Sequence, residues 1–139
     1  MLILKCQVSL AFLKKIVYTG GMKNTTTGLK RILKAFTYSW QGLKATFKSE
    51  AAFRQDLIVF LVGTITCFCL SLSGIQRALM MFSLFFILLM ELVNSAIEVI
   101  IDRISPKYHP LSGRAKDIGS SLVLLAFVNA IVVWCLILF

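Results

Sequence analysis

Five polar residues recur at helical spacing inside an otherwise apolar stretch of the chain. They are Glu91, Asn94, Ser95, Glu98 and Asp102, and they share an arc about 100° wide on one helix face. A carboxylate near the bilayer centre costs at least about 2.5 to 3.5 kcal/mol if it faces lipid. The stripe therefore has to face protein, water, a metal ion or a substrate headgroup. A seam between helices would explain Ser95 and Asn94, whereas the carboxylates favour a functional site at Glu91 and Glu98.

Two further polar segments lie on either side of this stretch in the sequence. SEAAFRQD, residues 49–56, holds two carboxylates and an arginine, and on spacing alone it is typical of a solvated helix end. KYHPLSGRAKD, residues 107–117, holds the only histidine and three cations. We expect it to be a loop that ends at the N-terminus of a helix, where backbone N–H groups favour anions. Phosphate binding and contact with lipid headgroups explain its charge equally well.

Familiar catalytic signatures are missing from the sequence. There is no GxxxxGK[ST], no GxGxxG and no HRD or DFG set, and a single histidine, His109, cannot form a catalytic triad. The four cysteines include no CxxC pair, so we interpret them as packing residues rather than metal ligands or disulfides. A nucleotide-using enzyme of this sequence would need another architecture.

The composition requires lipid as the solvent for much of the chain. The 139 residues are 58% hydrophobic with a mean hydropathy of +0.86, too apolar for one small soluble core. The net charge is +9, and ten of the fifteen Lys and Arg residues precede residue 57. Because this basic excess flanks apolar segments, anionic lipid explains it better than nucleic acid, and no nucleic-acid partner is expected.

The elements that position the polar residues are all expected to be helices. Residues 29–48 show apolar positions at helical spacing with lysines behind them, as in a helix lying in the membrane interface. Three apolar spans follow at about 54–72, 78–101 and 118–139. The fold class is therefore an all-α membrane protein. Cations concentrate at the N-terminus and in the second loop, which predicts a cytoplasmic N-terminus and an external C-terminus.

The first 21 residues look detached from the rest. They are a poor signal peptide because they lack a small-residue cleavage site. Met22 opens a plausible second start. We expect residues 1–21 to be an extension outside the functional domain of residues 22–139; the alternative is a short interfacial anchor.

Four segments closely resemble the prokaryotic diacylglycerol kinases. They are ELVNSAIEVIIDR (91–103), HPLSGRAKDIGSS (109–121), EAAFRQD (50–56) and YSWQGL (38–43). The resemblance runs from about Met22 to the C-terminus. It implies a homotrimer of three-span protomers in the bacterial inner membrane, with composite sites at the cytoplasmic surface between protomers. The implied reaction is the phosphorylation of diacylglycerol to phosphatidic acid by ATP with Mg²⁺.

The resemblance also implies a role for each matching residue. Glu91 matches the general base for the lipid hydroxyl, and Asn94 lines the same catalytic site. Glu50 and Glu98 match the carboxylates that hold the metal of metal–ATP. The implied nucleotide contacts are Arg31, Tyr38, Glu50, Glu98, Lys107, Tyr108, His109, Lys116 and Asp117. The implied lipid-substrate contacts are Arg31, Trp40, Ala52, Phe53, Arg54, Gln55, Asp56, Glu91 and Ser120.

Some features leave alternatives open. Lys107 and Pro110 stand where acidic residues are expected in the family, and the undecaprenol kinases share the polar stripe. A different class of protein, a small ion or proton-coupled transport subunit, would use Glu91 and Glu98 as a relay. A relay needs polar groups across the full membrane, and the other two spans offer few. We also expect that three helices cannot surround the stripe within one protomer, which would make the chain an obligate oligomer.

Overall fold

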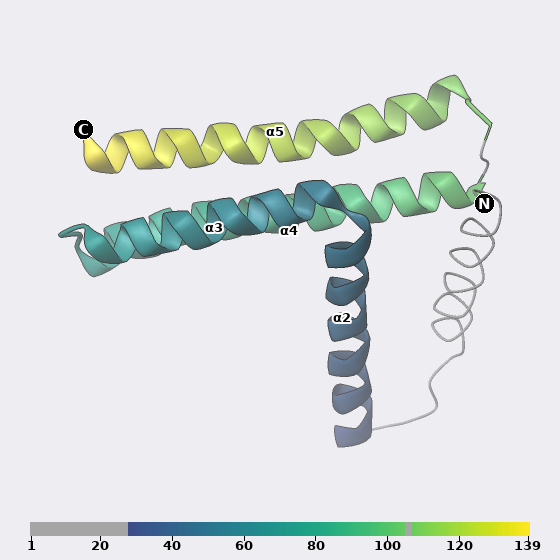
Figure 1. Ribbon diagram of the computed structural model, residues 1–139, viewed down its shortest axis with the longest axis horizontal. Helices are drawn as coiled ribbons and strands as arrows, with labels where there is room; N and C mark the ends of the chain where they lie inside the picture. The colour runs from purple at the N-terminus through teal and green to yellow at the C-terminus, as the bar shows by residue number, and fades with distance from the viewer. Residues whose placement is uncertain (1–27, 105–106) are drawn as a thin grey trace. The chain divides into compact units, whose positions relative to one another are not determined.

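The computed structural model describes residues 28–104 and 107–139. Its helices are α2, Leu29–Ser49; α3, Ala51–Cys69; α4, Gly74–Ile104; and α5, Pro110–Leu138 (Figure 1). Every regular element in these ranges is helical, which confirms the predicted all-α fold class. The prediction that residues 1–21 are an extension lies outside the described residues.

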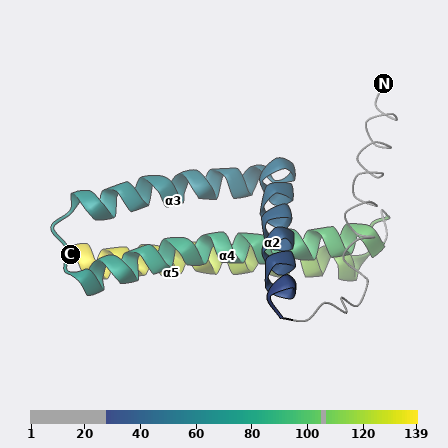
Figure 2. The same cartoon turned by 90° about the horizontal axis from the view of Figure 1, so that it is seen from below.

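The chain divides into two compact units, and the second, Gln41–Phe139, holds the end of α2 and all of α3, α4 and α5. Within this unit α4 packs against both α3 and α5, and the three helices run side by side (Figures 1 and 2). Each is long and apolar enough to cross a membrane. The three predicted spans are therefore confirmed as candidate membrane helices within residues 28–104 and 107–139, and the chain is a membrane protein.

Helix α2 is amphipathic and buries none of its residues. Its large apolar side chains, such as Leu29, Phe36 and Trp40, are all exposed. An apolar stripe of this kind requires another apolar surface to cover it. The helix was predicted from residues 29–48, and its placement in the membrane interface stays a prediction.

The turn between α3 and α4 is held by side chains that satisfy the helix ends. Ser73 and Gln76 form a reciprocal cap, because the Ser73 N–H donates to Gln76 Oε1 at 2.9 Å and the Gln76 N–H donates to Ser73 Oγ at 3.3 Å. Arg77 Nε donates to the carbonyl oxygen of Cys67 at 3.1 Å, and its guanidinium lies over the Phe68 ring. Arg77, in the first turn of α4, therefore satisfies a carbonyl group at the end of α3.

Helix α5 begins at Pro110, before the apolar run that predicts it. Proline at the first helical position has its φ angle fixed in the helical range. His109 is the N-cap, and its Nδ1 accepts a hydrogen bond from the Leu111 N–H at 3.2 Å. The prediction of a loop over residues 107–117 is therefore wrong beyond residue 109. Periodicity could not show this, because the first turns of α5 are polar.

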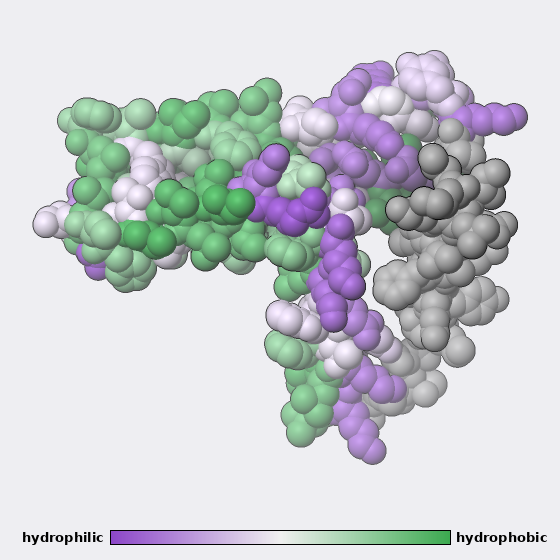
Figure 3. Space-filling view, in the orientation of Figure 1, coloured by the Kyte–Doolittle hydropathy of each residue, from purple (hydrophilic) through white to green (hydrophobic). Residues whose placement is uncertain are grey.

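The half of the three-helix unit that contains the turn between α3 and α4 is predominantly hydrophobic on the face shown in Figure 3. Gly63 of α3 is buried against Leu84 of α4, so that an added Cβ would lie 2.6 Å from Leu84 Cδ1. Ala126 and Ala130 of α5 pack on Ile87 in the same half. Small residues let membrane helices approach closely, and dispersion contacts then hold them together.

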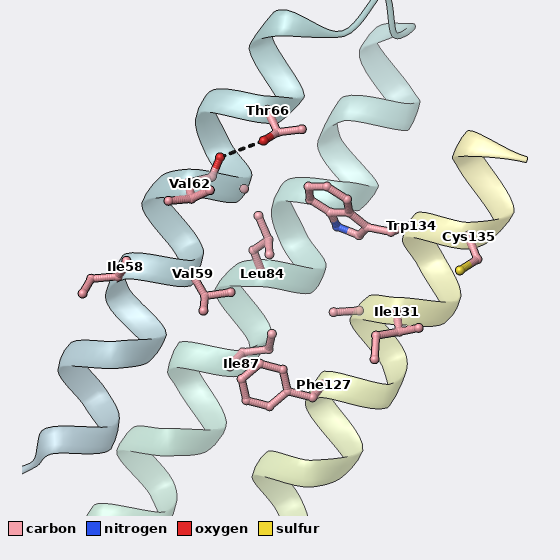
Figure 4. A pocket seen from close by; sticks show the side chains of 12 residues that line it. Ile58, Val59, Val62, Thr66, Leu84, Ile87, Phe127, Ile131, Trp134 and Cys135 are labelled. Carbon is pink, nitrogen blue, oxygen red and sulfur yellow. Dashed lines mark hydrogen bonds between the residues drawn. The ribbon is translucent and has the colours of Figure 1, made fainter.

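An apolar groove lies between α3 and α5 and has α4 as its floor (Figure 4). Its volume is about 530 Å³. Thr66 lines it, but the Thr66 hydroxyl donates to the Val62 carbonyl oxygen at 3.0 Å and so adds little polarity. The groove is lined by Ile58, Val59, Val62, Gly63, Thr66, Leu84, Ile87, Phe127, Ala130, Ile131, Trp134 and Cys135.

Candidate functional site

Four polar side chains of α3 and α4 are buried, and we call them the polar cluster. They are Asp56 of α3, 8% exposed, and Glu91, Asn94 and Ser95 of α4, which are 4%, 8% and 6% exposed. Burying ionisable groups is expensive unless they are paired or serve a ligand. The stripe of α4 was expected to face protein, water, a metal ion or a substrate headgroup, and its first three members are buried within the chain.

Carboxylates from three parts of the chain surround Glu91. Its charge interacts with those of Asp56 on α3, Glu98 on α4 and Glu50 between α2 and α3. Like charges repel strongly where little water screens them. A concentration of carboxylates like this one is suited to binding a cation or to exchanging a proton.

Hydrogen bonds satisfy only part of the polar cluster. Asn94 Nδ2 donates to Glu98 Oε1 at 3.3 Å. Three buried atoms, Asp56 Oδ2, Asn94 Oδ1 and Ser95 Oγ, find no hydrogen-bond partner among the residues that the structure describes. Buried polar atoms are nearly always paired. These three atoms are therefore placed to contact a ligand, a water molecule or another chain.

The segment of residues 49–56 is more structured than a solvated helix end. Glu50 is half-buried and extended, with φ −98° and ψ 115°, and it separates α2 from α3. Arg54 Nη1 donates to the carbonyl oxygen of Phe47 at 3.0 Å, which satisfies the C-terminus of α2. Phe53 and Asp56 are buried. The interpretation as a solvated end is therefore wrong for these two residues, because α3 turns that face toward α4.

An ion pair joins the end of α4 to the start of α5. Lys116 Nζ lies 2.5 Å from Asp102 Oδ1, and Lys116 also interacts electrostatically with Glu98. The Asp102 side chain is exposed and the Lys116 side chain is partly exposed, so the pair adds little to stability by itself. The ion pair instead holds Lys116 within electrostatic range of Glu98.

The remaining residues of the predicted site have open surroundings. Those on α2, at its junction with α3, or around the start of α5 are exposed: Arg31, Tyr38, Trp40, Ala52, Gln55, Lys107, Tyr108, His109, Asp117 and Ser120. The structure thus brings together Glu50, Asp56, Glu91, Asn94 and Glu98. The nucleotide and lipid assignments of the exposed residues stay predictions.

A metal site formed by protein side chains alone is not found in the described ranges. Among residues 28–104 and 107–139, no three His, Cys, Asp or Glu side chains form a group able to hold a metal ion. Magnesium in nucleotide sites commonly takes only one or two carboxylates and completes its shell with phosphate oxygens and water. Two carboxylates present here fit a metal ion that arrives with a nucleotide. Glu98 accepts a hydrogen bond from Asn94, and the charge of Glu50 interacts with that of Glu91.

A single chain covers only part of the polar stripe of α4, and the expected oligomer stays a prediction. Glu91, Asn94 and Ser95 are buried within one chain. The reason is that α3 and α5 cover two sides of α4. Glu98 is only half-buried and Asp102 is exposed, so the outer end of the stripe remains open.

These features define a class of protein: a three-span membrane protein with a buried carboxylate cluster near one end of its helices. A family model described as prokaryotic diacylglycerol kinase matches residues 37–138. The chain belongs to this family.

Its relatives match over most of both chains. It is 46% identical to the diacylglycerol kinase of Escherichia coli (strain K12) over 117 residues, which are 84% of this chain and 96% of that protein. It is 46% identical to the Pseudomonas aeruginosa diacylglycerol kinase over 112 residues, 81% of this chain and 91% of that protein. The Haemophilus influenzae protein is 42% identical over 114 residues, with 82% and 97% covered. The resemblance found in the sequence is confirmed, and the protein is an enzyme rather than a transport subunit.

Proposed function

We propose that the protein transfers the γ-phosphoryl group of ATP to the free hydroxyl of diacylglycerol, which gives phosphatidic acid and ADP. The observation that supports this most directly is a carboxylate, Glu91, buried on a membrane-spanning helix beside further carboxylates. Family membership supplies the reaction class. The buried cluster explains how a water-soluble donor and a membrane-embedded acceptor meet.

Glu91 acts as the general base in this proposal. It accepts the proton of the lipid hydroxyl, whose oxygen then forms a bond to the γ-phosphorus while the bond from that phosphorus to the ADP oxygen breaks. Glu91 lies seven residues from Glu98 on α4, about 10 Å along the helix. That separation suits an acceptor hydroxyl deeper in the membrane than the phosphates of the nucleotide.

Glu98 and Glu50 hold the divalent metal that accompanies ATP. Bound Mg²⁺ would neutralise charge on the phosphate oxygens. Asn94 orients Glu98 through its 3.3 Å hydrogen bond. Lys116 supplies positive charge for the phosphates. Asp56 and the residues around it contact the lipid glycerol region.

We further propose that the protein lies in the bacterial inner membrane with its N-terminus in the cytoplasm and works as a homotrimer. The distribution of its fifteen Lys and Arg residues supports the orientation. The half-buried Glu98 and the unpartnered atoms of the polar cluster support a site completed by another protomer. Native mass spectrometry in mild detergent tests the assembly, and an active monomer would contradict it.

One assay tests the proposed reaction. The purified protein is placed in vesicles with labelled ATP and Mg²⁺, with diacylglycerol and undecaprenol offered side by side. We expect label in phosphatidic acid and little in undecaprenyl phosphate. Preferential labelling of undecaprenol would show that undecaprenol, and not diacylglycerol, is the substrate. The absence of any lipid labelling would contradict the proposed kinase function.

A further inference from the structure

Gly119 of α5 faces Asn94 of α4 across a contact that has no room for a side chain. A Cβ atom on Gly119 would lie 2.5 Å from Asn94 Oδ1 and 3.6 Å from Ile97 Cδ1. The first distance is shorter than real Cβ contacts, so the asparagine side chain would have to move. Gly119 and Asn94 are both buried. The missing side chain at position 119 therefore creates the space that the Asn94 carboxamide occupies.

The position of that carboxamide matters because its other end supports Glu98. Asn94 Nδ2 donates to Glu98 Oε1 at 3.3 Å, toward the long end of the hydrogen-bond range. Asn94 Oδ1 has no hydrogen-bond partner in the described part of the chain to resist a displacement. The carboxamide is planar and rigid, so pushing Oδ1 moves Nδ2 with it. A methyl group on Gly119 would therefore break the hydrogen bond without first separating the helices.

We infer that Gly119 is a positioning residue for phosphoryl transfer. By lacking a side chain, it lets Asn94 hold the Glu98 carboxylate in the orientation that binds the metal of metal–ATP. This inference rests on the proposed role of Glu98. Hydrogen bonds that orient metal-binding groups typically change metal affinity by about 10- to 100-fold.

The direct test is Gly119→Ala in the full chain. Binding of Mn²⁺ in the presence of a non-hydrolysable ATP analogue is followed by electron paramagnetic resonance, without turnover. We expect the affinity for Mn²⁺ to fall by about tenfold or more. The Mg²⁺ concentration for half-maximal activity should rise in parallel, whereas the KM for diacylglycerol should not change. Unchanged Mn²⁺ affinity would overturn the inference.

Gly63→Ala is the matched control. Its Cβ would lie 2.6 Å from Leu84 Cδ1, so it introduces similar crowding against an apolar side chain. It should lower thermal stability about as much as Gly119→Ala and leave Mn²⁺ affinity unchanged. If Gly63→Ala weakens Mn²⁺ binding equally, the effect is general loosening of the helices, and the positioning role is wrong.

A double-mutant cycle shows whether Gly119 acts through Asn94. In an Asn94→Ala background the carboxamide is gone, so adding Gly119→Ala should cause no further loss of Mn²⁺ affinity. This comparison needs only Asn94→Ala and the double variant, which has room for the new methyl group, and it therefore stands even if Gly119→Ala alone fails to fold. A further loss in the double variant would contradict action through Asn94.

The proposed kinase function and the proposed role of Gly119 can be contradicted separately. A wild-type protein that phosphorylates no lipid would remove the proposed function. An active wild type whose Gly119→Ala variant binds Mn²⁺ normally would remove only the role of Gly119.

Discussion

Gly63 of α3 and Gly119 of α5 are each buried against a side chain of α4, and they differ in what they press against. Each is buried and leaves no room for a Cβ atom. The neighbour of Gly63 is Leu84, whereas the neighbour of Gly119 is the carboxamide of Asn94. The same packing arrangement therefore gives an apolar scaffold in one half and a tightly bounded polar site in the other.

The difference lies in how polar groups are satisfied. In the apolar half the buried Ser83 hydroxyl donates to the Met80 carbonyl oxygen at 2.7 Å. That half also contains two unpartnered atoms, Thr64 Oγ1 and Trp134 Nε1, but these belong to neutral side chains. In the polar half unpartnered atoms lie beside several carboxylates. The first half is mainly a packing scaffold, whereas the unpartnered atoms of the second half are placed to contact a ligand, a water molecule or another chain.

The largest expected effect comes from Glu91→Gln in the polar half. The change removes the proton acceptor and keeps its size and hydrogen-bonding capacity, so turnover should fall by about 100-fold or more. Because a buried charge is removed, thermal stability should hold or rise. Initial rates and thermal unfolding on one preparation measure both. Retained turnover would show that Glu91 is a structural residue, and it would contradict the assignment of catalysis to the polar half.

The metal requirement should respond next most strongly. Glu98→Gln and Glu50→Gln should each raise the Mg²⁺ and ATP concentrations needed for activity, by at least the roughly 10- to 100-fold expected for a supporting group. The oligomeric state should be the same as that of the wild type in both. Titration of activity with Mg²⁺ at saturating lipid checks this. A variant with normal metal dependence loses its assignment as a ligand.

A smaller effect distinguishes the two buried serines of α4. Ser83→Ala removes a satisfied hydrogen bond and should destabilise the protein by about 1 kcal/mol. Ser95→Ala removes an unpartnered hydroxyl, so it should not destabilise the fold but should lower activity several-fold. Thermal unfolding and initial rates of both variants are compared. If Ser95→Ala destabilises the protein and Ser83→Ala lowers its activity, the two halves do not differ in this way.

The smallest effect is expected from the N-terminus. A chain that begins at Met22 should keep its expression, membrane insertion and activity nearly unchanged, because the family resemblance starts there. Membrane fractionation and the vesicle assay measure this. A large loss of insertion would show that residues 1–21 are an anchor.

Much of the fold could be predicted from local sequence. Hydropathy and length are sufficient to predict the three spans. A backbone in lipid must form its hydrogen bonds internally, and a helix does this within one segment. The periodicity of Glu91, Asn94 and Ser95 predicted that they share one helix face and do not face lipid. The start of α5 at Pro110 was missed because its first turns carry charges and no apolar stripe. Proline after a capping residue was the local signal that could have found it.

The site was less predictable because it depends on how the helices align. Asp56 looks solvated in the sequence, and only the face that α3 turns toward α4 buries it. Gly119 carries no chemical signal of its own, and its contact with Asn94 exists only in the register of α4 with α5. Register is a property of tertiary packing, which a single sequence does not state.

The division of work within the polar half is tested most directly by comparing Glu91→Gln and Glu98→Gln in one experiment. Equilibrium affinity for an ATP analogue with Mg²⁺ and initial rates of lipid phosphorylation are measured on the same protein preparations. Glu91→Gln should bind the nucleotide as the wild type does and turn over about 100-fold or more slowly. Glu98→Gln should lose nucleotide and metal affinity. Loss of ATP binding in Glu91→Gln would place Glu91 in the metal site and contradict its role as the base.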